Sequence, residues 1–310
     1  MPLNTKKNNF KCLNCPVCNG FGCVGQLPGV GGVYENKNFQ LNCQAWIQIR
    51  ENNPELLKAI KEIKVELKHL RSGPVTGAEQ NIGYAEEKDF YLPYLQAALK
   101  SGIGVCVGDG CPDEKLMYGL EAAKTCGFSY TPEKEFYPEG AAFFLKPYPL
   151  EVLKKRVDLI KETASFIGMD IDSYNILTMR KLVNLEKKTA ADLQAFRSLF
   201  RQPFVIKGVF TAEDVELVKE IRPDVIFISN HGGRIETRVG STAEFLVNYG
   251  EELKKYCREL WIDGGLRTKE DIQTALYFGA DRVILARPII TALTHGGEKE
   301  VCRLVKSLVD

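Results

Sequence analysis

From about residue 73 onward, short runs of apolar and β-branched residues alternate with longer segments in which apolar positions recur every three to four residues. This alternation is typical of parallel strands joined by crossover helices. Eight runs are expected to form strands: 74–77 (the least regular), 102–109, 141–148, 166–172, 204–208, 225–230, 260–264 and 282–286. Eight such units match the usual size of a (β/α)8 TIM barrel, about 250 residues, better than they match an open doubly wound sheet.

Hydroxyl residues followed three positions later by a carboxylate mark the expected starts of four helices. Such a pair satisfies backbone N–H groups that have no partner in the first turn of a helix. The pairs are Thr189 with Asp192, Thr211 with Asp214, Ser241 with Glu244, and Thr268 with Asp271. One earlier helix is expected to begin at Asn53 and Pro54, because Leu56, Leu57, Ile60 and Ile63 follow at helical spacing.

Residues 1–72 differ in character from the barrel segment, 73–310. They hold a cluster of cysteines and a glycine-rich stretch at 29–32, and they contain few strand-like runs. We expect an N-terminal Cys-rich extension that packs on the barrel rather than a separate domain.

The composition excludes several classes of protein. With 45% hydrophobic and 26% charged residues, the chain is an ordinary folded protein and not a disordered or low-complexity one. Forty-one basic and 40 acidic residues give a net charge of +1, so no overall positive field is available to hold nucleic acid or an anionic membrane. No stretch approaches the roughly 20 apolar residues of a membrane span, and the first ten residues do not open a signal peptide. We therefore expect a cytoplasmic protein with neither nucleic acid nor membrane as a partner.

Four of the ten cysteines, Cys12, Cys15, Cys18 and Cys23, lie within twelve positions. Ten cysteines are too few for a disulfide-stapled scaffold, in which about 8–10% of residues are cysteine. The spacing is compatible with tetrahedral zinc and close to that of iron–sulfur proteins. Unliganded or disulfide-forming thiols are the remaining interpretation, and the sequence leaves the three open.

Polar residues end the expected strands at the edge where a TIM barrel places its reactive groups. Lys207 ends the fifth strand, and His231 follows the sixth, with Arg234 three residues later. A histidine in this place can be a loop residue held by backbone hydrogen bonds. Together with a fixed cation and a guanidinium, however, it supplies what is needed to remove a proton from a substrate that carries a carboxylate.

The last two strands end in Asp263-Gly-Gly-Leu-Arg267 and Ala286-Arg287-Pro288. In barrels of this kind a phosphate is commonly held here by backbone N–H groups and the start of a short helix. An Asp-Gly-Gly sequence alone is more often a turn. Paired with an arginine on the eighth strand, it predicts a phosphate site.

Taken together, these motifs resemble a known family. Residues 204–214, Ser229-Asn-His-Gly-Gly-Arg234 and the two motifs of the last strands resemble the FMN-dependent α-hydroxy acid oxidases and dehydrogenases, the group of glycolate oxidase and lactate oxidase. The resemblance is strong over residues 200–297 and weaker upstream, where it rests on strand order and on residues 108–115.

The resemblance implies that FMN lies across the barrel mouth and that the chain oxidises a small 2-hydroxy carboxylate to the 2-oxo acid. It implies that His231 is the base, that Arg234 binds the substrate carboxylate, and that Lys207 lies beside the N1/O2 edge of the flavin. The cofactor-binding residues that it implies are Lys207, Ser229, Asp263, Gly264, Gly265, Arg267, Ala286 and Arg287.

The chain departs from the family pattern at the substrate. Lys146 stands where typical members carry a tyrosine, so we expect Lys146 to contact the substrate. Arg180 is the nearest candidate for a second substrate arginine, and Asp170 and Asp172 end the fourth strand without an assigned role. Two alternatives stay open: a flavin barrel that acts on another substrate, and a non-catalytic flavin or metal redox sensor. We expect a homo-oligomer, and the sequence does not identify the electron acceptor.

Overall fold

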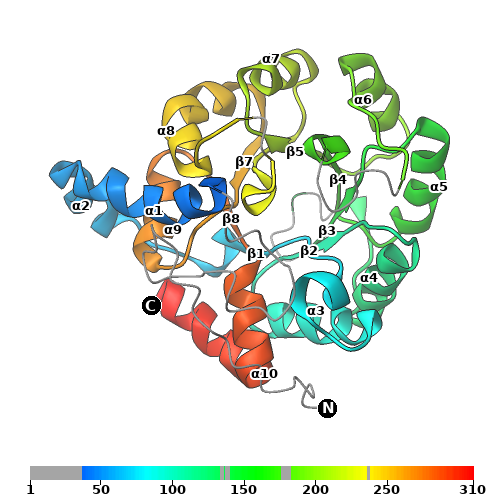
Figure 1. Cartoon of the computed structure of the whole chain (residues 1–310), viewed down its shortest axis with the longest axis horizontal. Helices are drawn as coiled ribbons and strands as arrows, with labels where there is room; N and C mark the ends of the chain where they lie inside the picture. Colours follow the sequence, from blue (N-terminus) through cyan, green and yellow to red (C-terminus); the bar gives the residue numbers. More distant parts are fainter. Residues whose placement is uncertain (1–36, 133–135, 137–139, 176–182, 236–237) are drawn as a thin grey trace.

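The computed structural model describes residues 37–132, 136, 140–175, 183–235 and 238–310. Eight parallel strands form one sheet in the order β1-β8-β7-β6-β5-β4-β3-β2 (Figure 1). The strands are β1 (Leu70–Ser72), β2 (Val105–Gly108), β3 (Ala141–Leu145), β4 (Phe166–Asp170), β5 (Phe204–Val209), β6 (Val225–Ile228), β7 (Glu259–Ile262) and β8 (Arg282–Leu285). Ser72 N donates to Gly104 O at 2.8 Å, which joins β1 to the segment entering β2 and closes the barrel. The predicted (β/α)8 TIM barrel is confirmed.

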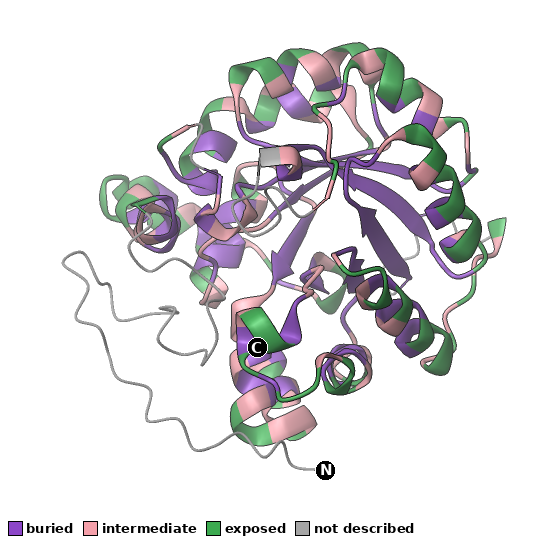
Figure 2. Cartoon of the chain, turned by 45° about the vertical axis from the view of Figure 1, so that its right-hand side comes forward, coloured by how far each residue is buried: buried purple, intermediate pink, exposed green. Residues whose placement is uncertain are grey.

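The helices cover the outside of the barrel. In Figure 2 the strands are almost entirely buried, whereas the surrounding helices turn their exposed faces outward. The helices after β1 are α3 (Tyr91–Lys100), α4 (Glu114–Thr125), α5 (Leu150–Ile160), α6 (Ala190–Arg197), α7 (Ala212–Ile221), α8 (Thr242–Leu253), α9 (Lys269–Tyr277) and α10 (Arg287–Val309). None of the helices in the described part of the chain is both long and apolar enough to cross a membrane.

The four predicted helix starts are confirmed at α6, α7, α8 and α9. Each begins with a reciprocal pair of hydrogen bonds between the hydroxyl residue and the carboxylate residue three positions on. At α7, Asp214 N donates to Thr211 Oγ1 at 3.2 Å, and Thr211 N donates to Asp214 Oδ2 at 2.8 Å. These bonds satisfy first-turn N–H groups and fix where each helix leaves the preceding strand.

The prediction for the first strand was wrong. Strand β1 is Leu70–Ser72, and residues 74–77 form the loop that follows it. Pro74 has no N–H to donate to a strand ladder, and Gly77 has a φ of 76°, which no strand contains. The barrel therefore begins three residues before the boundary expected at residue 73, and the mispredicted segment lines the barrel mouth.

Aromatic side chains fill the interior of the barrel. Phe144 of β3 contacts Phe227 of β6, with ring centroids 5.7 Å apart, and Phe166 of β4 contacts Trp261 of β7 at 5.2 Å. Alternate residues of a strand point to the same side. Residues two positions after this aromatic layer therefore also point inward, nearer the carboxyl ends of the strands. They are Lys146, Ser229 and Asp263, joined by Asp170 and Lys207 on β4 and β5.

Within the described residues, two α-helices precede the barrel: α1 (Lys37–Glu51) and α2 (Pro54–Ala59). Helix α2 begins as predicted, because Asn53 Oδ1 accepts a hydrogen bond from Leu56 N at 3.1 Å. Helix α1 was not predicted. It lies against α8, α9 and the short helical turn η8 (His231–Gly233) that follows β6. Cys12, Cys15, Cys18 and Cys23 fall in residues 1–36, outside the described residues.

Candidate active site

A cavity opens at the carboxyl ends of the strands. Most of the predicted site residues line it: Lys146, Lys207, His231, Arg234, Asp263, Gly264, Gly265, Arg267, Ala286 and Arg287. Ser229 lies behind the lining and donates from Oγ to Asp263 Oδ2 at 2.9 Å. Arg180 falls within residues 176–182, outside the described residues. The structure therefore brings together groups that come from five different strands.

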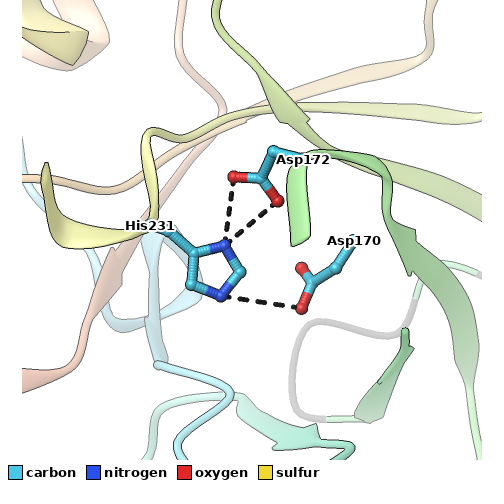
Figure 3. Close-up of side chains that lie close together, drawn as sticks. All are labelled: Asp170, Asp172 and His231. Atoms are coloured by element: carbon cyan, nitrogen blue, oxygen red, sulfur yellow. Dashed lines mark hydrogen bonds and ion pairs between the residues drawn. The ribbon is translucent and has the colours of Figure 1, made fainter. Parts of the chain in front are cut away.

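His231 is held by a carboxylate on one side of its ring. Its Nδ1 lies 3.0 Å from both oxygens of Asp172, which belongs to the short helix η7 (Ile171–Asn175) after β4 (Figure 3). Because an ionised carboxylate only accepts hydrogen bonds, Nδ1 carries the proton and Nε2 has the lone pair. The histidine is thus oriented to accept a proton at Nε2.

The surroundings of His231 favour its neutral form. Burial lowers its pKa, the carboxylate of Asp172 opposes that shift, and the ammonium groups of Lys207 and Lys146 lower the pKa further. Its side chain is 14% exposed, so it borders the cavity rather than the core. At neutral pH the imidazole is therefore available as a base.

Asp170 binds two lysines at once. Its Oδ2 lies 2.6 Å from Lys146 Nζ, and its Oδ1 lies 2.8 Å from Lys207 Nζ. Burial alone would raise the pKa of Asp170, but the two ammonium groups hold it well below its usual range. Burial likewise opposes the charged form of Lys207, yet Asp170, and then Asp172 and Asp263, raise its pKa. Both ions are therefore charged in the folded protein.

Asp170, Asp172 and His231 also have the geometry of a possible metal site, since one ligand atom from each lies within 4.8 Å of the others. Figure 3 shows the two carboxylates on either side of the imidazole. The lysines decide against this interpretation. Lys146 and Lys207 already place positive charge against both oxygens of Asp170, and a divalent cation would be repelled by them.

A family model described as FMN-dependent dehydrogenase matches residues 154–310, which is half of the chain and includes β4 to β8. The chain belongs to this family. FMN is therefore its cofactor, as the resemblance implied. The match includes every predicted cofactor-binding residue, from Lys207 to Arg287.

The curated relatives act on 2-hydroxy acids, as their names state. The chain is 38% identical over 119 residues to 2-hydroxyacid oxidase 2 of Bos taurus, an alignment that covers 37% of this chain and 33% of that protein. It is 34% identical over 119 residues to glycolate oxidase 3 of Oryza sativa subsp. indica, covering 38% of this chain and 32% of that protein. The aligned part thus spans about a third of the length of these relatives.

Solved structures match over nearly the whole chain. A mandelate oxidase superposes with a TM-score of 0.65 at 19% identity, covering 93% of this chain and 90% of that one. A lactate oxidase of Pediococcus acidilactici superposes with a TM-score of 0.68 at 17% identity, covering 90% and 81%. At this level of identity the likeness establishes the barrel fold.

The arginines of the cavity suit the phosphate of FMN. Arg234, Arg267 and Arg287 line the same space as Gly264 and Gly265. Burial lowers the pKa of Arg287 to about 9, with the like charges of Arg234 and Arg267 adding to the shift, and burial lowers the pKa of Arg234 to about 10. Three guanidinium groups gathered around one cavity favour a dianion between them, because it would relieve the repulsion of like charges.

Asp263 suits a hydroxyl of the cofactor's ribityl chain. Its Oδ2 accepts from Ser229, whereas its Oδ1 is buried and receives no hydrogen bond from any described residue. Burial raises the pKa of Asp263 to about 6. A buried acceptor without a donor is costly, and a hydroxyl group of a bound ligand would satisfy it. The residues present therefore fit FMN.

Sequence reasoning gave Asp172 no role, although the strand expected at 166–172 places it two positions after Asp170, a spacing that within a strand would direct both side chains to one side. It also missed Phe39 of α1, whose ring lies 4.0 Å beneath the guanidinium of Arg287. The spacing of two could have identified Asp172. Nothing local to residues 37–51 indicates that their partners lie about 200 positions away.

The zinc and iron–sulfur interpretations of the N-terminal cysteines gain no support from the comparisons. The four residues lie outside the described chain, so their role stays a prediction.

Proposed function

We propose that the chain is an oxidoreductase that oxidises a small 2-hydroxy carboxylate to the 2-oxo acid with FMN as its cofactor. The observation that carries the proposal is the His231–Asp172 pair, which leaves the unprotonated Nε2 at a cavity that Lys207 and Arg234 also line. The names of the curated relatives support the same chemistry. A non-catalytic redox sensor would not need an oriented base beside a carboxylate-binding arginine.

Arg234 binds the substrate carboxylate in this proposal. Its guanidinium lines the cavity three residues after the base on the same loop, so a bound carboxylate places the carbinol group near His231. Lys146 Nζ lies 3.4 Å from Nε2, which puts its ammonium beside the same carbinol group. Lys146 is thus the residue that distinguishes this substrate site from those of family members with a tyrosine there.

His231 accepts one proton of the carbinol group at Nε2. Asp172 keeps Nδ1 protonated and stabilises the imidazolium that forms. FMN, when bound, would accept the other hydrogen of the carbinol group together with two electrons, as a hydride equivalent, so that the substrate becomes the 2-oxo acid. Lys207 provides positive charge beside the place where the flavin would lie. It would lower the free energy of the negative charge that the flavin ring gains on reduction.

Anaerobic mixing of the FMN-loaded protein with a panel of 2-hydroxy acids tests the proposal. At least one acid should bleach the flavin absorbance, with the matching 2-oxo acid formed in equal amount. Failure of every acid in the panel to reduce bound FMN would overturn the proposal. Heat release of the chromophore and its mass identify FMN independently of turnover.

We further propose that the protein is cytoplasmic and that it forms homo-oligomers. A membrane or nucleic-acid partner is not part of the proposal, because the charge balance of +1 supplies no general attraction to either. Light scattering of the purified protein and fractionation of cells test the two points. Oxygen, a quinone or a protein can each serve as the electron acceptor in this proposal, and reoxidation rates of the reduced protein distinguish them.

A further inference from the structure

Helix α1 presents three residues to the barrel mouth at a spacing of four positions: Asn38, Asn42 and Trp46. All three are almost fully buried, at 3%, 1% and 0% exposure. Buried amide groups are unfavourable unless their hydrogen bonds are made, so two asparagines on such a face require specific partners. Those partners lie in the loops after β6 and β7, which carry the predicted site residues.

Asn42 pairs with the residue that precedes the base. Its Nδ2 donates to Asn230 Oδ1 at 2.7 Å, and Asn230 Nδ2 donates back to Asn42 Oδ1 at 3.1 Å. Asn42 Oδ1 also accepts from Thr242 N at 3.0 Å, at the start of α8. One side chain thus joins α1 to both ends of the segment that contains His231.

That segment has a backbone that needs support. His231 has a φ of 56°, and Gly232 and Gly233 follow with φ values of 65° and 91°. A residue with a side chain rarely adopts this left-handed conformation, which costs about 1–3 kcal/mol unless the surroundings impose it. Asn230 Oδ1 closes the turn by accepting from Gly233 N at 3.0 Å, and this is the oxygen that Asn42 also holds.

The glycines of the two site loops make the contact with α1 possible. A Cβ at Gly233 would lie 2.4 Å from Phe39 N, and a Cβ at Gly265 would lie 1.8 Å from Asn42 O. Only glycine permits so close an approach of two backbones. Gly233 and Gly265 therefore bring α1 against the site, in addition to any role at the cofactor.

We propose that Asn42 is a positioning residue for the reaction: by holding Asn230, it fixes the left-handed turn that directs His231 Nε2 into the cavity. This inference rests on the proposed function for its catalytic meaning, although the positioning itself does not depend on any substrate. The helix that precedes the barrel is, on this view, part of the active site.

The full-length, FMN-loaded protein with ¹⁵N-labelled histidine provides a test without substrate. The chain has three histidines, His69, His231 and His295. The signal that disappears in the variant His231→Gln is the signal of His231. In Asn42→Ala we expect the ring ¹⁵N signals of His231 to move and its pKa to rise toward its ordinary value, because water reaches the ring. The charged groups that face the ring, Asp170, Asp172, Lys146 and Lys207, are unchanged. The signals of His69 and His295 should stay in place.

Kinetics separate positioning from general destabilisation. We expect Asn42→Ala to lower kcat for flavin reduction about 10- to 100-fold, the size of effect that a misplaced reacting group produces, while KM and FMN affinity change less than about threefold. The matched control is Trp46→Phe. It removes the bond from Trp46 Nε1 to Gly264 O, 2.8 Å long, and should weaken FMN retention without moving the His231 signals.

Two further variants keep the test decisive. As a second variant, Asn42→Asp retains the acceptor for Thr242 N but places a carboxylate oxygen, in place of the donor Nδ2, against Asn230 Oδ1. The contact with Asn230 is then repulsive, so this variant should also move the His231 signals. The double variant Asn42→Ala/Asn230→Ala should be no slower than Asn230→Ala alone, because Asn42 acts on His231 through Asn230. Unchanged His231 signals in a folded Asn42 variant, or multiplied kinetic losses in the double variant, would overturn the inference. Failure of every 2-hydroxy acid to react would overturn the proposed function but leave the histidine signals to decide this one.

Discussion

Lys146 Nζ lies 2.6 Å from Asp170 Oδ2, and their side chains are only 7% and 3% exposed. Lys146 introduces a buried positive charge, and this contact shows how the barrel tolerates it. Asp170 has two oxygens, and the second binds Lys207 at 2.8 Å. The lysine at position 146 is therefore accommodated by an acid that the neighbouring strand already presents to Lys207.

The first prediction concerns the stability of this cluster. Asp170→Asn should lower the free energy of unfolding by about 3–5 kcal/mol, because it leaves two buried ammonium groups without their carboxylate. Lys146→Met should cost less, since Asp170 keeps Lys207. Urea unfolding of both variants measures the difference, and Asp158→Asn, in an exposed pair with Lys161, is the control without measurable effect. If Lys146→Met and Asp170→Asn lowered the free energy of unfolding equally, the two lysines would not share the carboxylate of Asp170.

Lys207 is predicted to set the reduction potential of bound FMN. Its ammonium stabilises negative charge at that side of the cavity, so Lys207→Met should lower the potential and slow flavin reduction by substrate. Equilibration with a reference dye measures the potential. Lys161→Met, which changes an exposed lysine, should leave it unchanged. If Lys207→Met is reduced as fast as the parent protein, Lys207 does not lie at the flavin.

Substitutions of His231 and Arg287 are predicted to impair different properties of the protein, flavin reduction and FMN binding respectively. His231→Ala should abolish flavin reduction by substrate while FMN stays bound, because the base acts in the transition state. Arg287→Ala should weaken FMN retention first, since its guanidinium belongs to the cluster that favours the phosphate. Ultrafiltration for free flavin and anaerobic mixing separate the two. Equal loss of FMN in both variants would contradict the assigned roles.

The sequence was sufficient to predict most strands of the barrel and most of the residues that line its mouth. The alternation of strand-like and helix-like runs can be recognised from neighbouring residues. So can the motifs that end the last strands and the hydroxyl–carboxylate pairs that begin α6 to α9. The site residues followed from the strands that they end, because a TIM barrel brings all its carboxyl ends to one face. β1 was misplaced because three residues, Leu70–Ser72, are too short a run to show a period.

The contacts made across the chain could not be predicted in this way. Asn42 bonds to a residue 188 positions away, and no local pattern in α1 marks it as a partner of Asn230. The sharing of Asp170 by two lysines is equally hidden, because it depends on the register of β3, β4 and β5. Sequence patterns identify which groups reach the cavity, whereas pairings within it depend on distances that only the fold determines.

The acid limb of the pH profile should report His231. Burial lowers its pKa, so kcat/KM for flavin reduction should fall only as pH drops below the ordinary value of 6.5. The folded protein binds this proton less tightly than the unfolded chain does. The stability that neutral His231 contributes is therefore complete above pH 6.5, and it is lost as pH falls from 6.5 toward the lower pKa of the folded state.

Asp172 opposes the lowering of the pKa of His231. Asp172→Asn should therefore shift the acid limb to still lower pH, and it should reduce kcat about tenfold or more because Nδ1–H is no longer held by a carboxylate. Rates of flavin reduction measured across pH for both proteins test this. A limb above pH 6.5 in the parent, or an upward shift in the variant, would contradict the geometry of Figure 3.

The last prediction concerns the choice of substrate. Lys146 is already paired with Asp170, whereas Lys115 of α4 lines the same cavity and forms no ion pair with any described residue. A 2-hydroxy acid with a second carboxylate can place one on Arg234 and the other near Lys115, so such acids should react faster than glycolate or lactate. Lys115→Met should reduce this preference about tenfold, the size expected for one charge-assisted hydrogen bond, while Lys100→Met, at an exposed pair with Glu298, should not. If glycolate or lactate remains the best substrate, or if Lys115→Met slows all acids equally, the cationic residues of this mouth do not select the substrate.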